Sequence, residues 1–148
     1  MATSDSREVD IEATAAEILD VLADVEATPE WSSAQQSVEV IDRHPDGRPN
    51  QVKMRIKTVG ITDDQVVSYD WGENTVSWSL VSAGQLKSQD ATYTLTPRGE
   101  TTHVKFALAV DPLVPLPGFL LRRAIKGAME TATDGLRKRV LALKKGAH

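Results

Sequence analysis

The C-terminal segment of the chain, residues 111–148, has the periodicity of one long helix whose apolar face is built largely from small side chains. At about 100° per residue, one face carries Leu121, Ala124, Ile125, Ala128, Thr131, Ala132, Gly135, Leu136 and Leu143. The opposite face carries Arg122, Arg123, Lys126, Glu130, Thr133, Asp134, Arg137 and Lys144. A helix that only sealed a core would present Leu and Ile at most inward positions. The small side chains therefore predict a pocket beside this helix.

Between this helix and the N-terminal segment, apolar residues alternate with polar ones as in strands. The alternating sets are Val38 and Val40; Val52, Met54 and Ile56; Val67, Tyr69 and Trp71; Val76, Trp78 and Leu80; Tyr93 and Leu95; and Val104, Phe106, Leu108 and Val110. Turn-forming residues separate them, at 45–49, 63–64, 71–74, 83–84 and 97–100. Short turns between successive strands predict antiparallel pairing.

The N-terminal segment predicts one strand and two short helices. Residues 7–11 read as a strand, and Thr14 with Glu17 has the spacing of a capping box that starts a helix. Thr28 followed by Pro29 is a second start signal, with Pro at the first helical position. This second helix is expected to carry Trp31 and to end near residue 33. After the strands, Pro117 is expected to be the first residue of the long helix.

Composition narrows the functional classes. The 148 residues fit a single domain spanning 1–148, and no apolar run is long enough to cross a bilayer. The absence of cysteine and of a signal-peptide pattern agrees with a cytoplasmic protein. A net charge of −4 argues against nucleic acid as the partner. The basic residues near the C-terminus are explained by the dipole of a helix end.

Three segments resemble the START-like, helix-grip superfamily (SRPBCC), in particular its short actinobacterial polyketide cyclase/dehydrase-like branch. These segments are VDIEATAAEILDVLADVEATPEW, GQLKSQDATYTLTP and VDPLVPLPGFLLRRAI, and the resemblance covers nearly the whole chain. It implies an α+β helix-grip fold. In that fold a seven-stranded curved antiparallel sheet, two short N-terminal helices and a long C-terminal helix enclose an apolar cavity. Members of the superfamily include lipid carriers, hormone receptors and polyketide cyclases, so the fold alone does not identify the function.

The predicted ligand-binding residues are those expected to face one another across this cavity. Met54, Ile56, Tyr69, Trp71, Trp78, Tyr93, Phe106 and Leu108 are expected on the sheet side, and Leu121, Ala124, Ile125, Ala128, Thr131 and Ala132 on the helix side. The four Tyr and Trp residues would supply aromatic walls with polar tips. The alternative is that these side chains interdigitate and fill the space as an ordinary core.

No residue is predicted to be catalytic. His44 lies in a Pro-containing turn and is expected to be exposed, His103 is expected on the outer face of its strand, and His148 is terminal. Asp90 is expected to point outward unless a bulge reverses it, and Asp63 with Asp64 reads as a hairpin turn. No spacing of ligands predicts a metal or another cofactor.

These observations predict a protein that binds a small hydrophobic or aromatic molecule, lipid-like or polyketide-like, in an internal cavity. Entry is expected near residues 112–119. One alternative is an enzyme of the cyclase/dehydratase type. Another is a partner-binding or membrane-peripheral module that uses the apolar segment 113–121 and has no usable cavity. Oligomeric state is not predicted.

Overall fold

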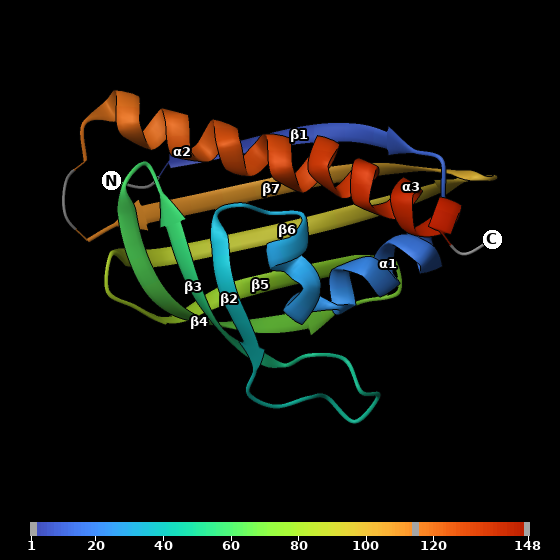
Figure 1. Cartoon of the computed structure of the whole chain (residues 1–148), viewed down its shortest axis with the longest axis horizontal. Helices are drawn as coiled ribbons and strands as arrows, with labels where there is room; N and C mark the ends of the chain where they lie inside the picture. Colours follow the sequence, from blue (N-terminus) through green and yellow to red (C-terminus); the bar gives the residue numbers. More distant parts are fainter. Residues whose placement is uncertain (1–2, 114–115, 147–148) are drawn as a thin grey trace.

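The computed structural model describes residues 3–113 and 116–146. It contains one antiparallel sheet that curves around the long C-terminal helix (Figure 1). The elements are β1 (Thr3–Ile11), α1 (Ala15–Ala23), η1 (Val25–Glu30), β2 (Gln35–Val40), β3 (Gln51–Thr58), β4 (Ile61–Trp71), β5 (Thr75–Ala83), β6 (Leu86–Arg98), β7 (Thr101–Pro112), α2 (Gly118–Glu130), η2 (Thr131–Gly135) and α3 (Leu136–Gly146). The seven strands follow the order β1-β7-β6-β5-β4-β3-β2, and every neighbouring pair is antiparallel. The predicted helix-grip fold is confirmed.

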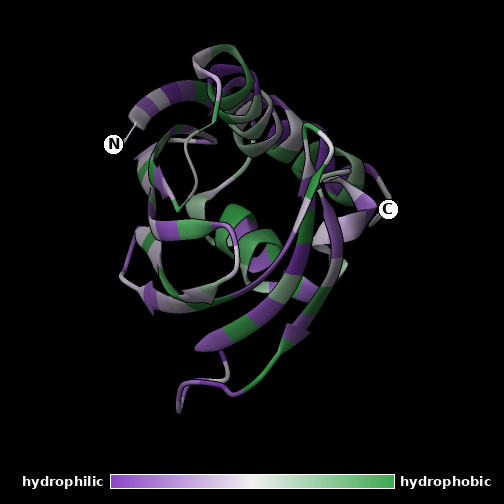
Figure 2. Ribbon diagram, turned by 90° about the vertical axis from the view of Figure 1, so that its left-hand side faces the viewer, coloured by the Kyte–Doolittle hydropathy of each residue, from purple (hydrophilic) through white to green (hydrophobic). Residues whose placement is uncertain are grey.

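The sheet bends around its concave face, and the C-terminal helix lies across the open side (Figure 2). The alternation read from the sequence decides which residues face inward. Along β4, Val67 and Tyr69 are buried while Asp70 is exposed, and along β7 Val104 and Phe106 are buried. Large apolar side chains therefore cover the concave face, as a half-buried antiparallel sheet requires.

The capping box forms as predicted, but the second helix has different bounds. The Thr14 hydroxyl accepts from the Glu17 amide at 3.2 Å, and the Glu17 carboxylate accepts from the Thr14 amide at 2.9 Å. The second helix is a 3₁₀ helix, η1, that contains Pro29 near its end, so the prediction that it starts at Thr28 is wrong. The chain turns directly after α1 because this turn buries Val25. Trp31 follows η1 as its C-cap residue.

The predicted hairpin turn at Asp63 and Asp64 is also wrong, because both residues lie within β4. The turn between β3 and β4 is made by Val59 and Gly60, whose φ angles are 47° and 82°. Two successive positive φ angles are the signature of the two-residue turn that matches strand twist. Gly60 adopts this conformation easily, whereas a β-branched residue such as Val59 rarely does.

The C-terminal helix is long, as predicted, but it is interrupted by one wide turn. Pro117 is the N-cap residue with ψ 134°, and helix α2 begins at Gly118, one residue later than predicted. Val114 and Pro115 of the predicted apolar segment lie outside the described residues, as does His148. Within η2 the Leu136 amide donates to the Thr131 carbonyl, the five-residue spacing of a π turn.

The π turn shifts the inward face of the helix from Thr133 onward. A turn that holds an extra residue rotates later positions backward relative to a regular α-helix. Thr133, predicted on the polar face, is therefore fully buried, and its hydroxyl donates to the Met129 carbonyl at 2.7 Å. Leu143, predicted to face inward, is 46% exposed, while Val140 is buried in its place.

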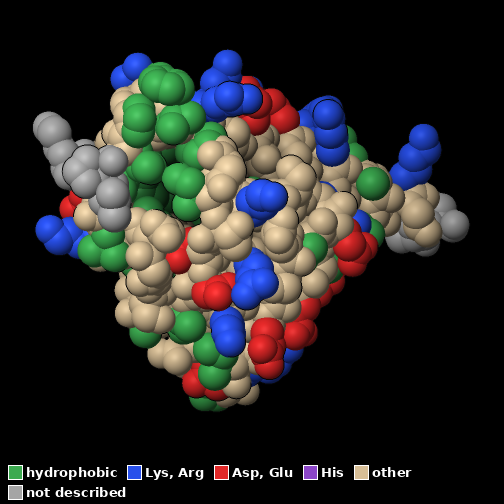
Figure 3. Space-filling view, turned by 60° about the vertical axis from the view of Figure 1, so that its left-hand side comes forward, with side chains coloured by type: hydrophobic (Ala, Val, Ile, Leu, Met, Phe, Trp, Pro, Cys, Tyr) green, Lys and Arg blue, Asp and Glu red, His purple; other side chains and the backbone are tan. Residues whose placement is uncertain are grey.

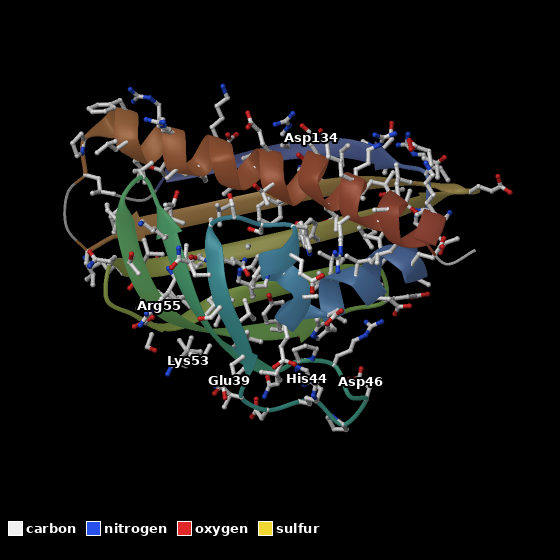
Figure 4. The ribbon with its side chains drawn as sticks, viewed as in Figure 1. Glu39, His44, Asp46, Lys53, Arg55 and Asp134 are labelled. Atoms are coloured by element: carbon white, nitrogen blue, oxygen red, sulfur yellow. The ribbon has the colours of Figure 1, made fainter. Side chains whose placement is uncertain are left out.

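Ion pairs hold the second half of this helix to the N-terminal elements. Arg7 of β1 binds Asp134 at 2.9 Å, and Arg137 binds Glu12 at 2.7 Å (Figure 4 labels Asp134). Arg139 pairs with Glu30, and Lys144 pairs with Glu17. Arg137, Arg139 and Lys144 near the C-terminus thus have acidic partners in the N-terminal part of the chain.

Among the described residues, no helix is both long and apolar enough to cross a membrane.

A second ion-pair group lies on the outer face of β1 and β7 and makes stability depend on pH. His103 contacts Glu8 at 2.8 Å and Asp10 at 2.7 Å, and these hydrogen bonds raise the pKa of His103 above its ordinary value. The same hydrogen bond lowers the pKa of Glu8. Lys105 and Arg98 also act on this group, both lowering the pKa of Glu8.

We therefore expect the wild type to gain stability over His103→Gln mainly at mildly acidic pH. A raised folded-state pKa stabilises the protein below the unfolded pKa of about 6.5, and this gain is lost as pH rises through the folded pKa. The gain also falls in strong acid, where Glu8 is protonated. Urea midpoints of both proteins at pH 6 and pH 9 measure the effect. An equal difference at the two pH values would contradict it.

Candidate functional site

A cavity of about 510 Å³ lies between the concave face of the sheet and the C-terminal helix. Its described walls come from the strands, from α2 and η2 above them, and from η1 and the segment after it at one end. The other end is bordered by the hairpin at Val59, the β5–β6 turn at Gln85, and Leu116 before α2. Figure 3 shows hydrophobic side chains gathered around a hollow on the face that it presents.

Most of the residues predicted to bind a ligand do line this cavity. They are Met54, Ile56, Tyr69, Trp78, Tyr93, Phe106 and Leu108 from the sheet, and Leu121, Ala124, Ile125, Ala128, Thr131 and Ala132 from the helix. The two sets border the same space because side chains repeat on one face every two residues in a strand and every 3.6 residues in a helix. The alternative of a completely filled core does not describe this region.

Four aromatic rings form a continuous wall on the sheet side. The ring centroids of Tyr69 and Trp78 are 5.2 Å apart, those of Trp78 and Tyr93 5.9 Å, and those of Tyr93 and Phe106 4.6 Å. These separations are typical of stacked and tilted aromatic pairs. The rings of the wall are therefore packed against one another.

Trp71, also predicted as a ligand contact, is not part of the described cavity lining. It continues the inward face of β4 and stacks on Tyr69 at 5.7 Å, but its indole N–H donates to the Pro49 carbonyl at 2.8 Å. Arg48 covers the ring from the other side, 5.0 Å from its centroid. The loop between β2 and β3 thus covers Trp71 beyond the end of the cavity.

His44 belongs to the same loop and is half-buried, so the prediction that it is exposed is wrong. One ring nitrogen, Nε2, lies 3.0 Å from the Tyr69 carbonyl oxygen. This contact joins the loop to β4, and it explains why a histidine in a Pro-containing turn is not fully solvated.

The two tyrosines of the cavity are both neutral, and the hydroxyl of Tyr93 contacts the C-terminal helix. The Tyr93 hydroxyl donates to the Ala132 carbonyl at 2.9 Å, and this carbonyl lies inside the π turn. Burial raises the pKa of both Tyr69 and Tyr93 well above the ordinary tyrosine value. Both phenols therefore stay neutral, and that of Tyr93 serves to attach η2 to β6.

Sequence reasoning missed the polar pair of the cavity, Asp63 and Gln65. Both lie on the inward face of β4, both line the cavity, and their exposed fractions are 8% and 4%. The Asp63 carboxylate accepts hydrogen bonds from the amides of Gly84 at 2.8 Å and Gln85 at 3.2 Å. The signal was present, because positions 63 and 65 continue the inward alternation of Val67 and Tyr69. It was hidden by the turn propensity of two successive aspartates.

Sequence reasoning also missed the closed end of the cavity. Leu22 of α1, Val25 of η1 and Trp31 line it there. The Trp31 indole nitrogen is buried without a hydrogen-bond partner among the described residues. A small residue of the C-terminal helix is found at this end too, where Gly135 lies next to the Trp31 ring.

The other candidate acids and bases lie outside the cavity. Asp70 and Asp90 are exposed on the outer face, as the strand parity predicts, because the nearby bulge falls between Leu86 and Ser88. His103 is on the outer face with Glu8 and Asp10. Within the described part of the chain, no three His, Cys, Asp or Glu side chains gather as a metal site.

The fold has clear counterparts among solved structures. A START superfamily protein from Mycobacterium smegmatis superposes with a TM-score of 0.86 at 24% identity, covering 95% of this chain and 98% of that one. The Zhui aromatase/cyclase from Streptomyces sp. R1128 gives 0.81 at 10% identity, covering 95% and 94%. A protein from Thermus thermophilus gives 0.79 at 22% identity, covering 95% and 99%. At these identities the likeness shows the fold.

Sequence comparison gives the family. No curated protein matches the chain. The model of the family described as "Polyketide cyclase / dehydrase and lipid transport" matches residues 3–141. Because this match spans nearly the whole chain, and the fold agrees with it, the protein belongs to the polyketide cyclase/dehydrase and lipid transport family.

Proposed function

We propose that this protein binds one small hydrophobic or aromatic molecule between the sheet and the C-terminal helix. The observation that carries the proposal is the apolar cavity of about 510 Å³ beneath Ala124, Ala128 and Ala132. This volume lies within the range of small-molecule sites, which is roughly 300 to 1,000 Å³. The family description, with its polyketide and lipid substrates, supports the same class of ligand.

The geometry supports apolar burial as the main source of affinity. The aromatic wall of Tyr69, Trp78, Tyr93 and Phe106 would meet one face of the ligand, and the small side chains of α2 the other. Removing apolar surface from water contributes about 25 cal/mol per Å². A ligand that is covered on both sides would have the apolar surface of both its faces removed from water.

Entry is proposed at the end where α2 begins. Leu113 and Phe119 flank this end and are 50% and 64% exposed, an unusual position for large apolar side chains. Leu116 between them lines the cavity. The hollow rimmed by hydrophobic side chains in Figure 3 agrees with an opening of this kind.

The second candidate, a cyclase or dehydratase, would need a group in the cavity that can move a proton. Among the described lining residues, the Tyr93 hydroxyl already donates to Ala132, and the Asp63 carboxylate already accepts from two backbone amides. Both groups therefore make structural hydrogen bonds that proton transfer would disturb. Burial raises the pKa of the other tyrosine of the lining, Tyr69, and so keeps its phenol protonated. For this reason we favour binding over catalysis.

Filling the cavity is expected to weaken binding. Ala128→Trp would place an indole in the space opposite the aromatic wall, and we expect the affinity for N-phenyl-1-naphthylamine to fall by about tenfold or more, as for loss of a well-packed apolar contact. Fluorescence titration measures the affinity, and circular dichroism verifies the fold. Ala124→Met, a smaller intrusion, is expected to weaken binding less.

The matched control is Lys126→Trp, the same new side chain on the outer face of α2, where Lys126 is 78% exposed. This variant is expected to bind the probe as the wild type does. Unchanged binding by a folded Ala128→Trp would reject the internal site. Equal loss in both Trp variants would also reject it.

Tyr93→Phe is expected to separate stability from binding. Removing the hydroxyl leaves the buried Ala132 carbonyl without its donor, which costs about 1–3 kcal/mol of unfolding free energy. The ring itself remains in the aromatic wall, so probe affinity is expected to change less than about threefold. Urea unfolding and the same fluorescence titration measure the two effects. An unfolding free energy equal to that of the wild type would contradict the role given to this hydrogen bond.

A further inference from the structure

We propose that Asp63 and Gln65 form a hydrogen-bond-accepting subsite that selects ligands with a hydroxyl group on their apolar or aromatic body. This inference rests on the proposed function, because it concerns the same cavity. It names the polar chemistry of the ligand, which the apolar walls alone do not specify.

The hydrogen bonds of Asp63 fix the orientation of the Gln65 amide. Asp63 Oδ1 accepts from the Gly84 and Gln85 amides, and Oδ2 lies 3.1 Å from Gln65 Nε2. A carboxylate only accepts hydrogen bonds, so the amide must turn its N–H toward Asp63. The carbonyl oxygen, Oε1, is then directed away from Asp63.

This carbonyl oxygen is the unsatisfied acceptor among the described lining residues, where Trp31 Nε1 is an unsatisfied donor. Gln65 Oε1 is buried and has no hydrogen-bond partner among the described residues. Buried polar atoms are nearly always paired in folded proteins, so an unpaired acceptor in the wall of a cavity calls for a donor. A ligand hydroxyl bonding to Oε1, after a small rotation of the amide, would supply it.

Asp63 and Gln65 favour a ligand group that donates a hydrogen bond over one that only accepts. A ketone or ether oxygen would face acceptor atoms on both Asp63 and Gln65 and would gain no hydrogen bond from them. An ammonium group would bring a second buried charge, although the Asp63 charge is already met by three N–H groups. A neutral hydroxyl is the group that fits.

The position of the subsite agrees with an amphipathic ligand. Gln65 lies two inward positions along β4 from Tyr69, roughly 13 Å at the rise of a strand. The apolar body would therefore rest against the aromatic wall while the hydroxyl reaches the end bordered by the β5–β6 turn. Gly84 in that turn lets the backbone approach, since a Cβ there would lie 3.1 Å from Asp63 Oδ1.

The first test compares two probes on the wild-type protein at pH 7, 2-naphthol and 2-methoxynaphthalene. The ether is the more apolar molecule and keeps the oxygen, but it has no O–H to donate. We expect 2-naphthol to bind about fivefold or more tightly, the usual effect of one hydrogen bond to a buried partner. Displacement of N-phenyl-1-naphthylamine measures both affinities. Equal or tighter binding of the ether would overturn the proposal.

The second test reverses the polarity of the subsite with Asp63→Asn. The two backbone amides hold the new side-chain oxygen in place, so its NH₂ group faces Gln65. Gln65 must then accept, and its own NH₂ takes the position of Oε1 in the cavity wall. We expect the preference for 2-naphthol over 2-methoxynaphthalene to disappear, and 2-acetonaphthone, which offers a carbonyl, to bind more tightly than to the wild type. A preference for 2-naphthol that is unchanged in this variant would overturn the subsite.

The control is Asp64→Asn, which makes the same change of charge one residue away. Asp64 is exposed on the outer face of β4 and pairs with Arg55 at 2.9 Å (Figure 4 labels Arg55). This variant is expected to keep the wild-type preference, and a loss of preference here would overturn the proposal. If none of the probes binds the wild type, the proposed function fails together with this inference. If all bind without discrimination, only the subsite fails.

Discussion

The hydrogen bond from the Tyr93 hydroxyl to the Ala132 carbonyl determines how the C-terminal helix meets the sheet. It joins β6 to the π turn in the middle of the helix, 39 residues away in the sequence. On one side of this point, α3 is held close by the ion pairs of Arg137 and Lys144. On the other side, α2 crosses the sheet with Ala124 and Ala128 facing inward. The helix is therefore fixed at one end and spaced from the sheet at the other, and the cavity lies in that space.

This arrangement explains why large side chains on the sheet do not simply fill the cavity. Trp78, Tyr93 and Phe106 are stacked against one another along the wall, so they cannot reach toward α2 without losing those contacts. Helix α2 leads directly into η2, which the Tyr93 hydroxyl attaches to β6. Small residues on α2 opposite a packed aromatic wall thus leave the space that forms the cavity.

The fold and most of the cavity wall could be predicted from the sequence because both depend on local periodicity. Alternation placed Met54, Tyr69 and Phe106 on one face, and helical spacing placed Ala124 and Ala128 opposite them. The π turn could not be predicted in this way. The carbonyl within it is satisfied by a hydroxyl from a distant strand, and no local pattern records that contact. The errors at Thr133 and Leu143 follow directly from the residue that this turn inserts.

Asp63 shows the same limit at the level of chemistry. Two successive aspartates favour a turn by propensity, but the amides of Gly84 and Gln85 stabilise the Asp63 carboxylate inside the sheet. That contact again comes from a neighbouring hairpin rather than from adjacent residues. It also has a consequence for the cavity. Once Asp63 is held by backbone donors, Gln65 can satisfy it with only one end of its amide, and the other end has no partner among the described residues.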